Sequence, residues 1–216
     1  MQKISFFILF ISFMSSCSII KNKERDRYVI SELEKVEEEE VEEEVLLTPL
    51  PPLVIKTDLA LLSDIMDSKN LSSKYKVFYN GGIQRDMKVD NLNYDKLINY
   101  AKSFLGTPHR MGGLSKSGID CSGLLYVSFK NQGFDPPRIA QDFGRYGTII
   151  IEKNQLEKGD LVFFTGTTST SKLISHVGIF LGYNEFIHTS SSKGVTISDI
   201  NNKYWSDKFI FGTRLK

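Results

Sequence analysis

The hydrophobic and polar positions divide the 216-residue chain into three parts. An apolar run from Ile4 to Met14 follows a short polar start. The stretch up to residue 90 is polar and acidic, with nine glutamates within residues 32–44. From residue 91 onward, apolar residues recur at spacings typical of helices and strands. We therefore expect a signal peptide over residues 1–16, a flexible tether over residues 17–90 and one folded domain over residues 91–216.

Two helices are expected at the start of the folded domain. Asn91 or Asn93 can cap the first helix, which we expect to end at Gly106. Its apolar residues at helical spacing are Leu97, Ile98, Ala101, Phe104 and Leu105. A glycine-containing loop then leads to Asp120, a favourable N-cap for a second helix over residues 121–131.

Strands are expected in the remainder of the chain. The segments concerned are 161–164, 176–181, 185–189, 195–198 and 209–214. A three-residue turn over residues 182–184 would join the second and third strands, pairing Leu181 with Glu185 and Phe180 with Phe186. Helices followed by a run of strands favour an α+β domain in which the helices pack on one side of a central antiparallel sheet.

One thiol and two imidazoles are the main candidates for chemistry. Cys121 would open the second helix, where free backbone N–H groups favour a thiolate and, together with the adjacent Ser122, can stabilise an oxyanion. His176 and His188 would lie diagonally across the expected hairpin on one face. This pattern predicts a cysteine hydrolase with Cys121 as nucleophile, His176 as general base and His188 as the orienting group.

The cysteine count supports a reactive thiol. Ser15 and Ser16 precede Cys17 in a manner that resembles the lipobox of bacterial lipoproteins, in which the cysteine is lipidated. Cys121 would then have no disulfide partner in an exported chain. The alternatives are an ordinary signal peptide cleaved elsewhere and a Cys121 that is only buried.

The net charge differs between the two parts of the chain. Residues 92–216 contain 15 basic and 10 acidic residues, whereas the preceding part is net acidic. Neither part has the basic clusters of a nucleic-acid-binding protein, and a moderately basic domain would suit a polyanionic cell envelope.

Apolar residues within 53–80 could form a short helix that packs on the domain or on a partner.

Six motifs in order resemble those of the NlpC/P60 peptidases, which are papain-like cysteine hydrolases of bacterial cell walls. The motifs are Gly106-Thr107-Pro108 with Gly112-Gly113, Asp120-Cys121-Ser122-Gly123, Pro137-Arg138, Gly159-Asp160-Leu161-Val162-Phe163-Phe164, His176-Val177-Gly178-Ile179 and Phe186-Ile187-His188-Thr189. The resemblance implies a papain-like NlpC/P60 fold and assigns the nucleophile, the base and the orienting residue to Cys121, His176 and His188.

The resemblance also implies a substrate and a location. The substrate would be peptidoglycan stem peptides, cut at the bond from γ-D-Glu to diaminopimelate or from D-Ala to diaminopimelate. No metal or organic cofactor is implied. The chain is expected to be a monomer, held in the cell envelope by lipid on Cys17 and facing the periplasm from the outer membrane.

Alternative roles are open for His109, Arg110 and Arg138, which lie near or within the motifs. The family commonly has a tyrosine shortly before the double glycine, where this chain has His109, so this histidine could lie beside the site or in solvent. Arg110 and Arg138 could bind substrate carboxylates, or could be ordinary surface residues.

Three other functions use the same residues. The histidines and Cys121 could bind zinc, although their spacing contains no close ligand pair. The fold could serve as a lipid-anchored scaffold that binds peptidoglycan without turnover. The same triad could also act as an amidase or acyltransferase on other substrates.

Overall fold

The computed structural model describes residues 58–215 of the chain. The signal peptide, Cys17 and the glutamate-rich segment expected from the sequence lie outside these residues. The helices are α2 (Asp58–Ser68), α3 (Ser72–Asn80), α4 (Tyr94–Lys102), α5 (Cys121–Lys130), α6 (Ala140–Phe143) and α7 (Lys203–Lys208), with a 3-10 helix η1 (Lys153–Gln155). Within the described part, none of the helices has the length and apolar character needed to cross a membrane.

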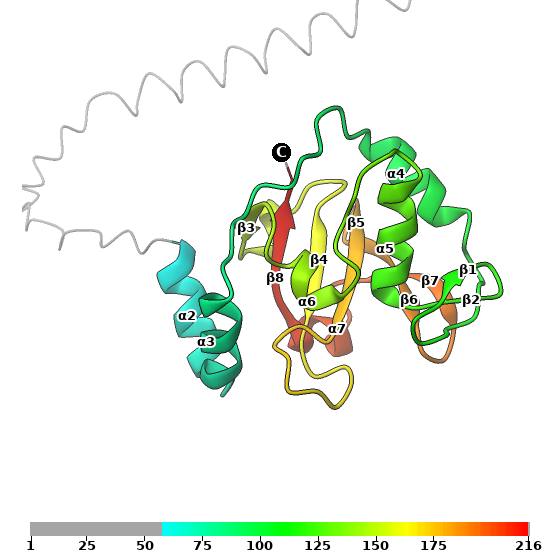
Figure 1. Ribbon diagram of the computed structural model, residues 1–216. Coiled ribbons are helices and arrows are strands. Elements are labelled where there is room, and N and C mark those ends of the chain that lie inside the picture. The colour runs from blue at the N-terminus through cyan, green and yellow to red at the C-terminus, as the bar shows by residue number, and fades with distance from the viewer. Residues whose placement is uncertain (1–57, 216) are drawn as a thin grey trace, which may run out of the picture. The chain divides into compact units, whose positions relative to one another are not determined.

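Six strands form the central sheet in the order β3-β8-β4-β5-β6-β7, with every neighbouring pair antiparallel (Figure 1). Their bounds are β3 (Thr148–Ile150), β4 (Leu161–Phe164), β5 (His176–Gly182), β6 (Glu185–Ser190), β7 (Gly194–Asp199) and β8 (Phe209–Arg214). A separate small hairpin joins β1 (Leu114–Ser115) to β2 (Gly118–Ile119).

Both faces of the sheet are covered, because alternate residues of the central strands enter two different apolar clusters. In β4, Leu161 and Phe163 pack with helices α2 to α6, whereas Val162 and Phe164 pack on the opposite face with Trp205 of α7. This alternation follows from the period of two in a strand. It explains why all four residues of β4 are buried and confirms the expected α+β class.

The longer helices share one face of the sheet. Leu97 of α4 and Leu124 and Leu125 of α5 are fully buried in the same cluster as Val177 and Ile179 of β5. In Figure 1, α5 lies beside β5 and β6 with its N-terminal end toward the edge where β5 begins. The N-terminus of α5 is therefore placed at the end of the sheet where β5 begins.

Residues 58–90 are part of the folded unit, so the expectation of a tether up to residue 90 is wrong for this segment. Leu62 and Met66 of α2 and Phe78 of α3 are fully buried. The ring of Phe78 packs against Phe211 of β8 with a centroid distance of 5.9 Å, and the Arg145 guanidinium donates to the Phe78 carbonyl. The segment folds despite its overall polarity because its spaced apolar residues pack against the apolar cluster that includes Phe211 of β8.

The expected element ends are largely right, with two corrections. Asn93 caps α4 by accepting a hydrogen bond from the Lys96 amide, but the helix ends at Lys102 and turns, rather than helix, lead to Gly106. The hairpin turn contains two residues, Tyr183 and Asn184, both with positive φ. Glu185 therefore pairs with Gly182, and an irregularity between Phe180 and Gly182 restores the expected pairing of Phe180 with Phe186.

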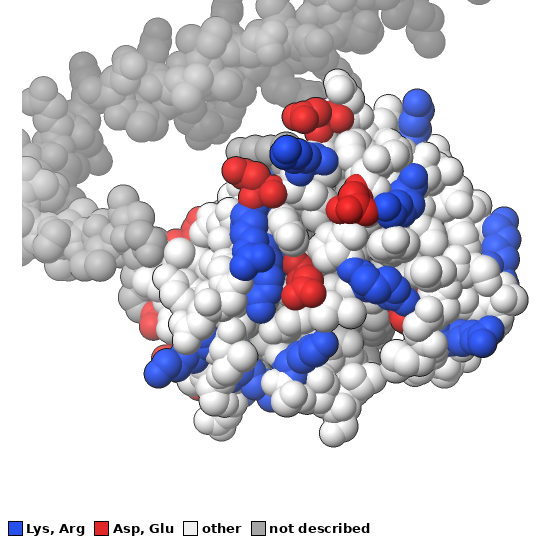
Figure 2. All heavy atoms as spheres, viewed as in Figure 1, with Lys and Arg blue, Asp and Glu red and all other residues white. Residues whose placement is uncertain are grey.

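Charged side chains are dispersed over the folded domain. Figure 2 shows acidic and basic groups interspersed on the face drawn, without one extended patch of either sign. One two-bond pairing joins Arg214 of β8 to the buried Asp160, with nitrogen to oxygen distances of 2.8 and 2.9 Å. Asp160 also accepts from the Glu157 amide at 2.6 Å, so its carboxylate holds the turn that leads into β4.

Candidate functional site

The candidate site lies at the end of the sheet where β5 begins and β6 ends. Cys121 is the first residue of α5, and His176 is the first residue of β5. The Thr189 hydroxyl of β6 donates to the carbonyl of Asp120 at 3.3 Å and thereby attaches the start of α5 to the end of β6. The thiol and both expected imidazoles are consequently brought to one end of the sheet.

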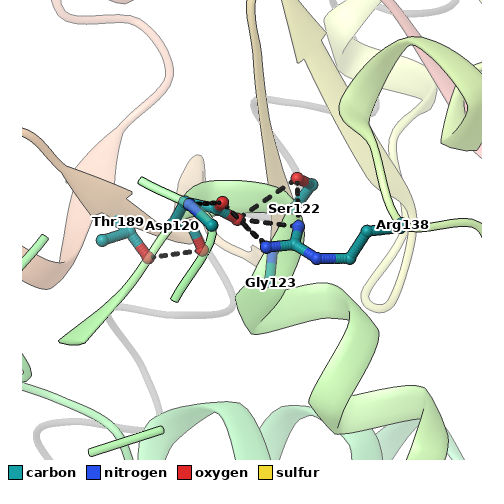
Figure 3. Close-up of polar contacts among 6 residues, drawn as sticks. Asp120, Ser122, Gly123, Arg138 and Thr189 are labelled. Atoms are coloured by element: carbon teal, nitrogen blue, oxygen red, sulfur yellow. Dashed lines mark hydrogen bonds and ion pairs between the residues drawn. The ribbon is translucent and has the colours of Figure 1, made fainter. Parts of the chain in front are cut away.

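The N-terminus of α5 is fixed by the Asp120 carboxylate (Figure 3). One of its oxygens accepts from the Gly123 amide at 2.6 Å, and the other accepts from the Gly112 amide at 2.7 Å. Arg138 donates to both oxygens, at 3.0 and 2.9 Å, and also to the Ser122 hydroxyl at 3.1 Å. Burial raises the pKa of Asp120, but the hydrogen bonds from Arg138 and the two amides outweigh this effect and hold that pKa below its ordinary value.

A glycine at position 123 is required by close approach of the preceding loop. A Cβ atom at Gly123 would lie 2.4 Å from the carbonyl oxygen of Gly113, a distance that real Cβ contacts do not reach. The loop can therefore lie directly on the first turn of α5, where Gly112 also meets Asp120. This packing explains why glycines occur both in the loop before Cys121 and at position 123 after it.

The two imidazoles are in direct contact. Nε2 of His176 lies 3.0 Å from Nδ1 of His188, and Nε2 of His188 lies 3.0 Å from the hydroxyl of Ser198 on β7. His188 is fully buried and His176 is 8% exposed. Nδ1 is therefore the nitrogen of His176 that His188 leaves free. The diagonal contact expected across the hairpin is present despite the irregularity near its turn.

Trp205 of α7 encloses the imidazole pair. Its ring stacks on His176 at 5.2 Å with an interplanar angle of 27°, and it meets His188 edge-on at 4.7 Å. Phe186 stacks on the other side of His188 at 4.7 Å. Flat aromatic contacts restrict rotation of both imidazoles and exclude water from them. Burial accordingly lowers the pKa of His176 well below 6.5, an effect to which His188 and His109 add by electrostatic repulsion.

The thiol is neutral in the free protein near pH 7. Burial raises the pKa of Cys121 to about 11, although the backbone N–H groups of Val177, Ser122 and Cys121 itself act in the opposite direction. The contact with Val177 places the sulfur beside the residue that follows His176. Because both His176 and Cys121 favour their neutral forms, proton transfer between them would accompany attack rather than precede it.

A cavity of about 490 Å³ opens over these groups. It is lined by Cys121, both imidazoles and Trp205, together with many hydroxyl side chains. The lining serines and threonines are Ser122, Thr167, Thr168, Thr170, Ser175, Thr189, Ser190, Ser191, Ser192, Thr196 and Ser198. Such a volume suits a short peptide segment, and so many hydroxyl groups suit a polar ligand better than an acyl chain.

The remaining expected site residues have different placements. His109 and Ser122 line the same cavity as Cys121. Arg110 is exposed, lies outside the cavity lining, and packs its side chain near Gly118. Arg138 is half-buried and directs both terminal nitrogens at Asp120 and Ser122. Its expected contact with substrate stays a prediction, whereas its contact with the α5 N-terminus is direct.

Residues 58–215 contain no group of three or more histidine, cysteine, aspartate or glutamate side chains arranged to hold a metal ion. His188 uses both of its ring nitrogens on His176 and Ser198.

Two residues of the site were missed by the sequence reasoning. Ser198 lies diagonally from His188 because Thr196 is the direct partner of His188 on β7, and strand alternation could have revealed this relation. Trp205 lies on a short helix with no strong periodicity. Its only sequence signal is that it is the single tryptophan of the chain.

Acidification is expected to destabilise the domain through His188. Burial lowers the pKa of His188 to about 4, whereas an unfolded histidine titrates near 6.5. As the pH falls, the unfolded chain binds a proton first, so the stabilisation is complete above pH 6.5 and is lost between pH 6.5 and about 4. The two pKa values differ enough to lower the free energy of unfolding by about 3 kcal/mol.

Urea unfolding of the native chain at pH 7.0 and pH 4.5 measures this loss. The variant His188→Asn cannot titrate in this range, so its free energy of unfolding should depend less steeply on pH. An identical pH dependence in the two proteins would contradict the assignment of the loss to His188.

Comparison with curated proteins reveals clear relatives. The chain is 43% identical over 110 residues to the probable endopeptidase NlpC of Escherichia coli K12, covering 50% of this chain and 69% of that protein. It is 38% identical over 120 residues to the probable endopeptidase NlpC homolog of Haemophilus influenzae, covering 55% and 61%. The murein DD-endopeptidase MepS/murein LD-carboxypeptidase of E. coli K12 is 37% identical over 116 residues, covering 53% and 58%. The matches thus span about 60% of the relatives' own length.

Solved structures and a family model agree with these relatives. An NlpC/P60 family protein from Bacillus cereus aligns with a TM-score of 0.51 at 31% identity, covering 57% of this chain and 40% of that one. A similar-to-lipoprotein NLP/P60 family structure from Staphylococcus aureus aligns with the same TM-score at 29% identity, covering 61% and 43%. The NlpC/P60 family model matches residues 106–214, which include Cys121, His176 and His188. The chain belongs to the NlpC/P60 family, as its motifs had indicated.

Proposed function

We propose that this protein is a cell-wall cysteine endopeptidase that hydrolyses amide bonds in peptidoglycan stem peptides. The observation that supports it most directly is the contact chain from His176 through His188 to Ser198, located in the same cavity as the Cys121 thiol. The names of the relatives, which include endopeptidases of murein, support the choice of substrate.

The first chemical step is attack by Cys121 on the carbonyl carbon of the scissile amide. Nδ1 of His176 accepts the thiol proton, which requires the remaining proton of the neutral ring to lie on Nε2. That N–H donates to Nδ1 of His188, and the Nε2–H of His188 then donates to Ser198. This set of tautomers satisfies every contact, and in it His188 holds His176 in the form that can act as a base.

The following steps use the same groups. Backbone N–H groups at the start of α5 stabilise the oxyanion of the tetrahedral intermediate, and the Cys121 and Ser122 amides are those directed toward the sulfur. The imidazolium of His176 returns its proton to the leaving amine, which leaves a thioester on Cys121. A water molecule, deprotonated by His176, hydrolyses the thioester and restores the free thiol.

The scissile bond links diaminopimelate to either γ-D-Glu or D-Ala. The hydroxyl-lined cavity supports a polar peptide substrate in both cases. In the same proposal, Cys17 is lipidated and anchors the domain in the outer membrane of the bacterial envelope, facing the periplasm, with the acidic segment as a spacer. This anchoring rests on the sequence around Cys17, which lies outside the described residues.

The test is mass spectrometry of purified peptidoglycan fragments after incubation with the full chain or with its Cys121→Ala variant. New stem-peptide fragments should form with the native chain only, and their masses identify the bond. If both proteins bind the fragments equally and neither cuts them, the peptidase proposal is wrong and a peptidoglycan-binding scaffold takes its place.

A further inference from the structure

The cavity has a positive electrostatic character that the catalytic groups do not explain. Its lining contains one acidic side chain, Asp120, and this carboxylate is already paired with Arg138. The lining also contains two lysines, Lys172 and Lys193. Within residues 58–215, neither ammonium group has a hydrogen bond or an ion pair with another residue. Two uncompensated cations consequently face a cavity whose acid is neutralised.

Lys193 lies on a turn that the fold holds in place. The hydroxyl of Ser190 accepts from the Lys193 amide at 3.3 Å. The next residue, Gly194, has a φ of +70°, and a Cβ atom there would lie 2.2 Å from the Thr107 carbonyl oxygen. The Val195 amide then donates to that carbonyl at 2.8 Å. The backbone of Lys193 is therefore fixed, while its ammonium group remains free to meet a ligand.

Lys172 lies on a second fixed loop, between β4 and β5. Its amide donates to the Thr170 hydroxyl at 3.2 Å, and the Thr167 hydroxyl lies 2.7 Å from the Ser175 hydroxyl across the base of the loop. Lys74 of α3 donates to the Thr170 carbonyl at 2.8 Å. The adjacent Leu173 is fully buried and anchors the loop on the core.

The two lysines flank the imidazole pair. The β4–β5 loop precedes His176, and the β6–β7 turn follows His188 by a few residues. Because β5 and β6 are antiparallel neighbours, the start of β5 and the end of β6 lie at the same end of the sheet. Both connections therefore emerge at that end. Lys193 is near enough to His188 to lower the pKa of that imidazole by repulsion. A ligand in the cavity would thus meet a cation on either side of the reacting groups.

We propose that Lys172 and Lys193 form a cationic rim that binds free carboxylate groups of the peptide substrate. The proposal rests on the proposed peptidase function and specifies its substrate further: a peptide that presents carboxylates beside the scissile amide. Lysine suits this role as a flexible point charge that can meet carboxylates in more than one position. Arg138, by contrast, has its planar fork directed at Asp120.

Binding measurements separate this proposal from the catalytic one. We would use the full chain with Cys121→Ala, which leaves peptides intact, and measure by calorimetry the dissociation constant of the tetrapeptide L-Ala-γ-D-Glu-diaminopimelate-D-Ala. The same peptide with each carboxylate amidated in turn identifies which group is bound. Lys172→Gln and Lys193→Gln are introduced separately, with Lys102→Gln on α4 as the control, because Lys102 is exposed and lies outside the cavity.

Each cavity variant should weaken binding of the free-carboxylate peptide by about threefold to fivefold, as expected for a solvent-accessible ion pair. The effect should disappear for the peptide whose relevant carboxylate is amidated, and Lys102→Gln should change nothing. Unchanged affinity in both cavity variants, or an equal loss for free and fully amidated peptides, would show that the cationic rim does not bind substrate carboxylates. A native chain that binds peptides through these lysines but does not cut them would refute the peptidase function and leave the rim in place.

Discussion

Replacement of His176 by alanine is expected to lower kcat by about 10²-fold to 10⁴-fold, the range associated with general acid–base catalysis. The reason is the neutral state of the thiol. With a pKa of about 11, Cys121 has almost no thiolate at pH 7 and depends on His176 to accept its proton. Cys121→Ala should remove turnover completely, since no other nucleophile is available to form the thioester.

The effect should decrease along the contact chain. His188→Ala leaves the base in place but removes the group that orients it, so we expect a smaller loss than for His176→Ala, toward the lower end of that range. Ser198→Ala removes only the outer hydrogen bond, which corresponds to about fivefold if a neutral hydrogen bond contributes about 1 kcal/mol. The order His176, His188, Ser198 is the feature that distinguishes an orienting chain from three independent contributions.

Steady-state kinetics on a defined stem peptide measures the series, with urea unfolding of each variant to exclude loss of the fold. Ser206→Ala is the matched control for Ser198→Ala, because the Ser206 hydroxyl on α7 contacts Lys153 rather than an imidazole. Equal losses for Ser198→Ala and Ser206→Ala, or a larger loss for Ser198→Ala than for His188→Ala, would contradict the proposed order.

Local patterns in the sequence were sufficient to predict the arrangement of the imidazoles. Strand alternation placed His176 and His188 on one face, and antiparallel pairing placed them diagonally. The pairing of Phe180 with Phe186 was predicted correctly even though the turn was not. An extra residue near the turn shifts only the end of the ladder, so the imidazoles at the far end keep their relation.

Long-range packing decided the features that the sequence did not reveal. The sequence offered a helix within residues 53–80 but not the surface it would cover; α2 and α3 fold onto the domain because Leu62, Met66 and Phe78 find apolar partners far away in sequence, on β8 and elsewhere. Trp205 acquires its place over the imidazoles in the same way. A periodicity argument reads neighbours along the chain and cannot identify which distant surface an apolar residue will cover.

Arg138→Met is expected to lower the free energy of unfolding by about 2 to 3 kcal/mol. Removing one partner of a buried ion pair typically costs 3–5 kcal/mol because the other charge is left uncompensated. The cost should be smaller here, since the Arg138 side chain is 33% exposed and Asp120 keeps its two amide donors. Urea unfolding gives this value directly. Arg110→Met is the matched control, because Arg110 is exposed and lies outside the cavity.

A second substitution identifies the cause of this loss. Asp120→Asn removes the carboxylate charge and keeps a side chain that can cap α5, so it should restore part of the stability lost in Arg138→Met. Because Asp120 also positions the first turn of α5, Arg138→Met should lower kcat as well, and the double variant should recover part of that loss. If Arg138 acted only on a substrate carboxylate, Arg138→Met would raise KM while leaving stability unchanged, and Asp120→Asn would rescue neither quantity. The two roles therefore differ in a measurement made without substrate.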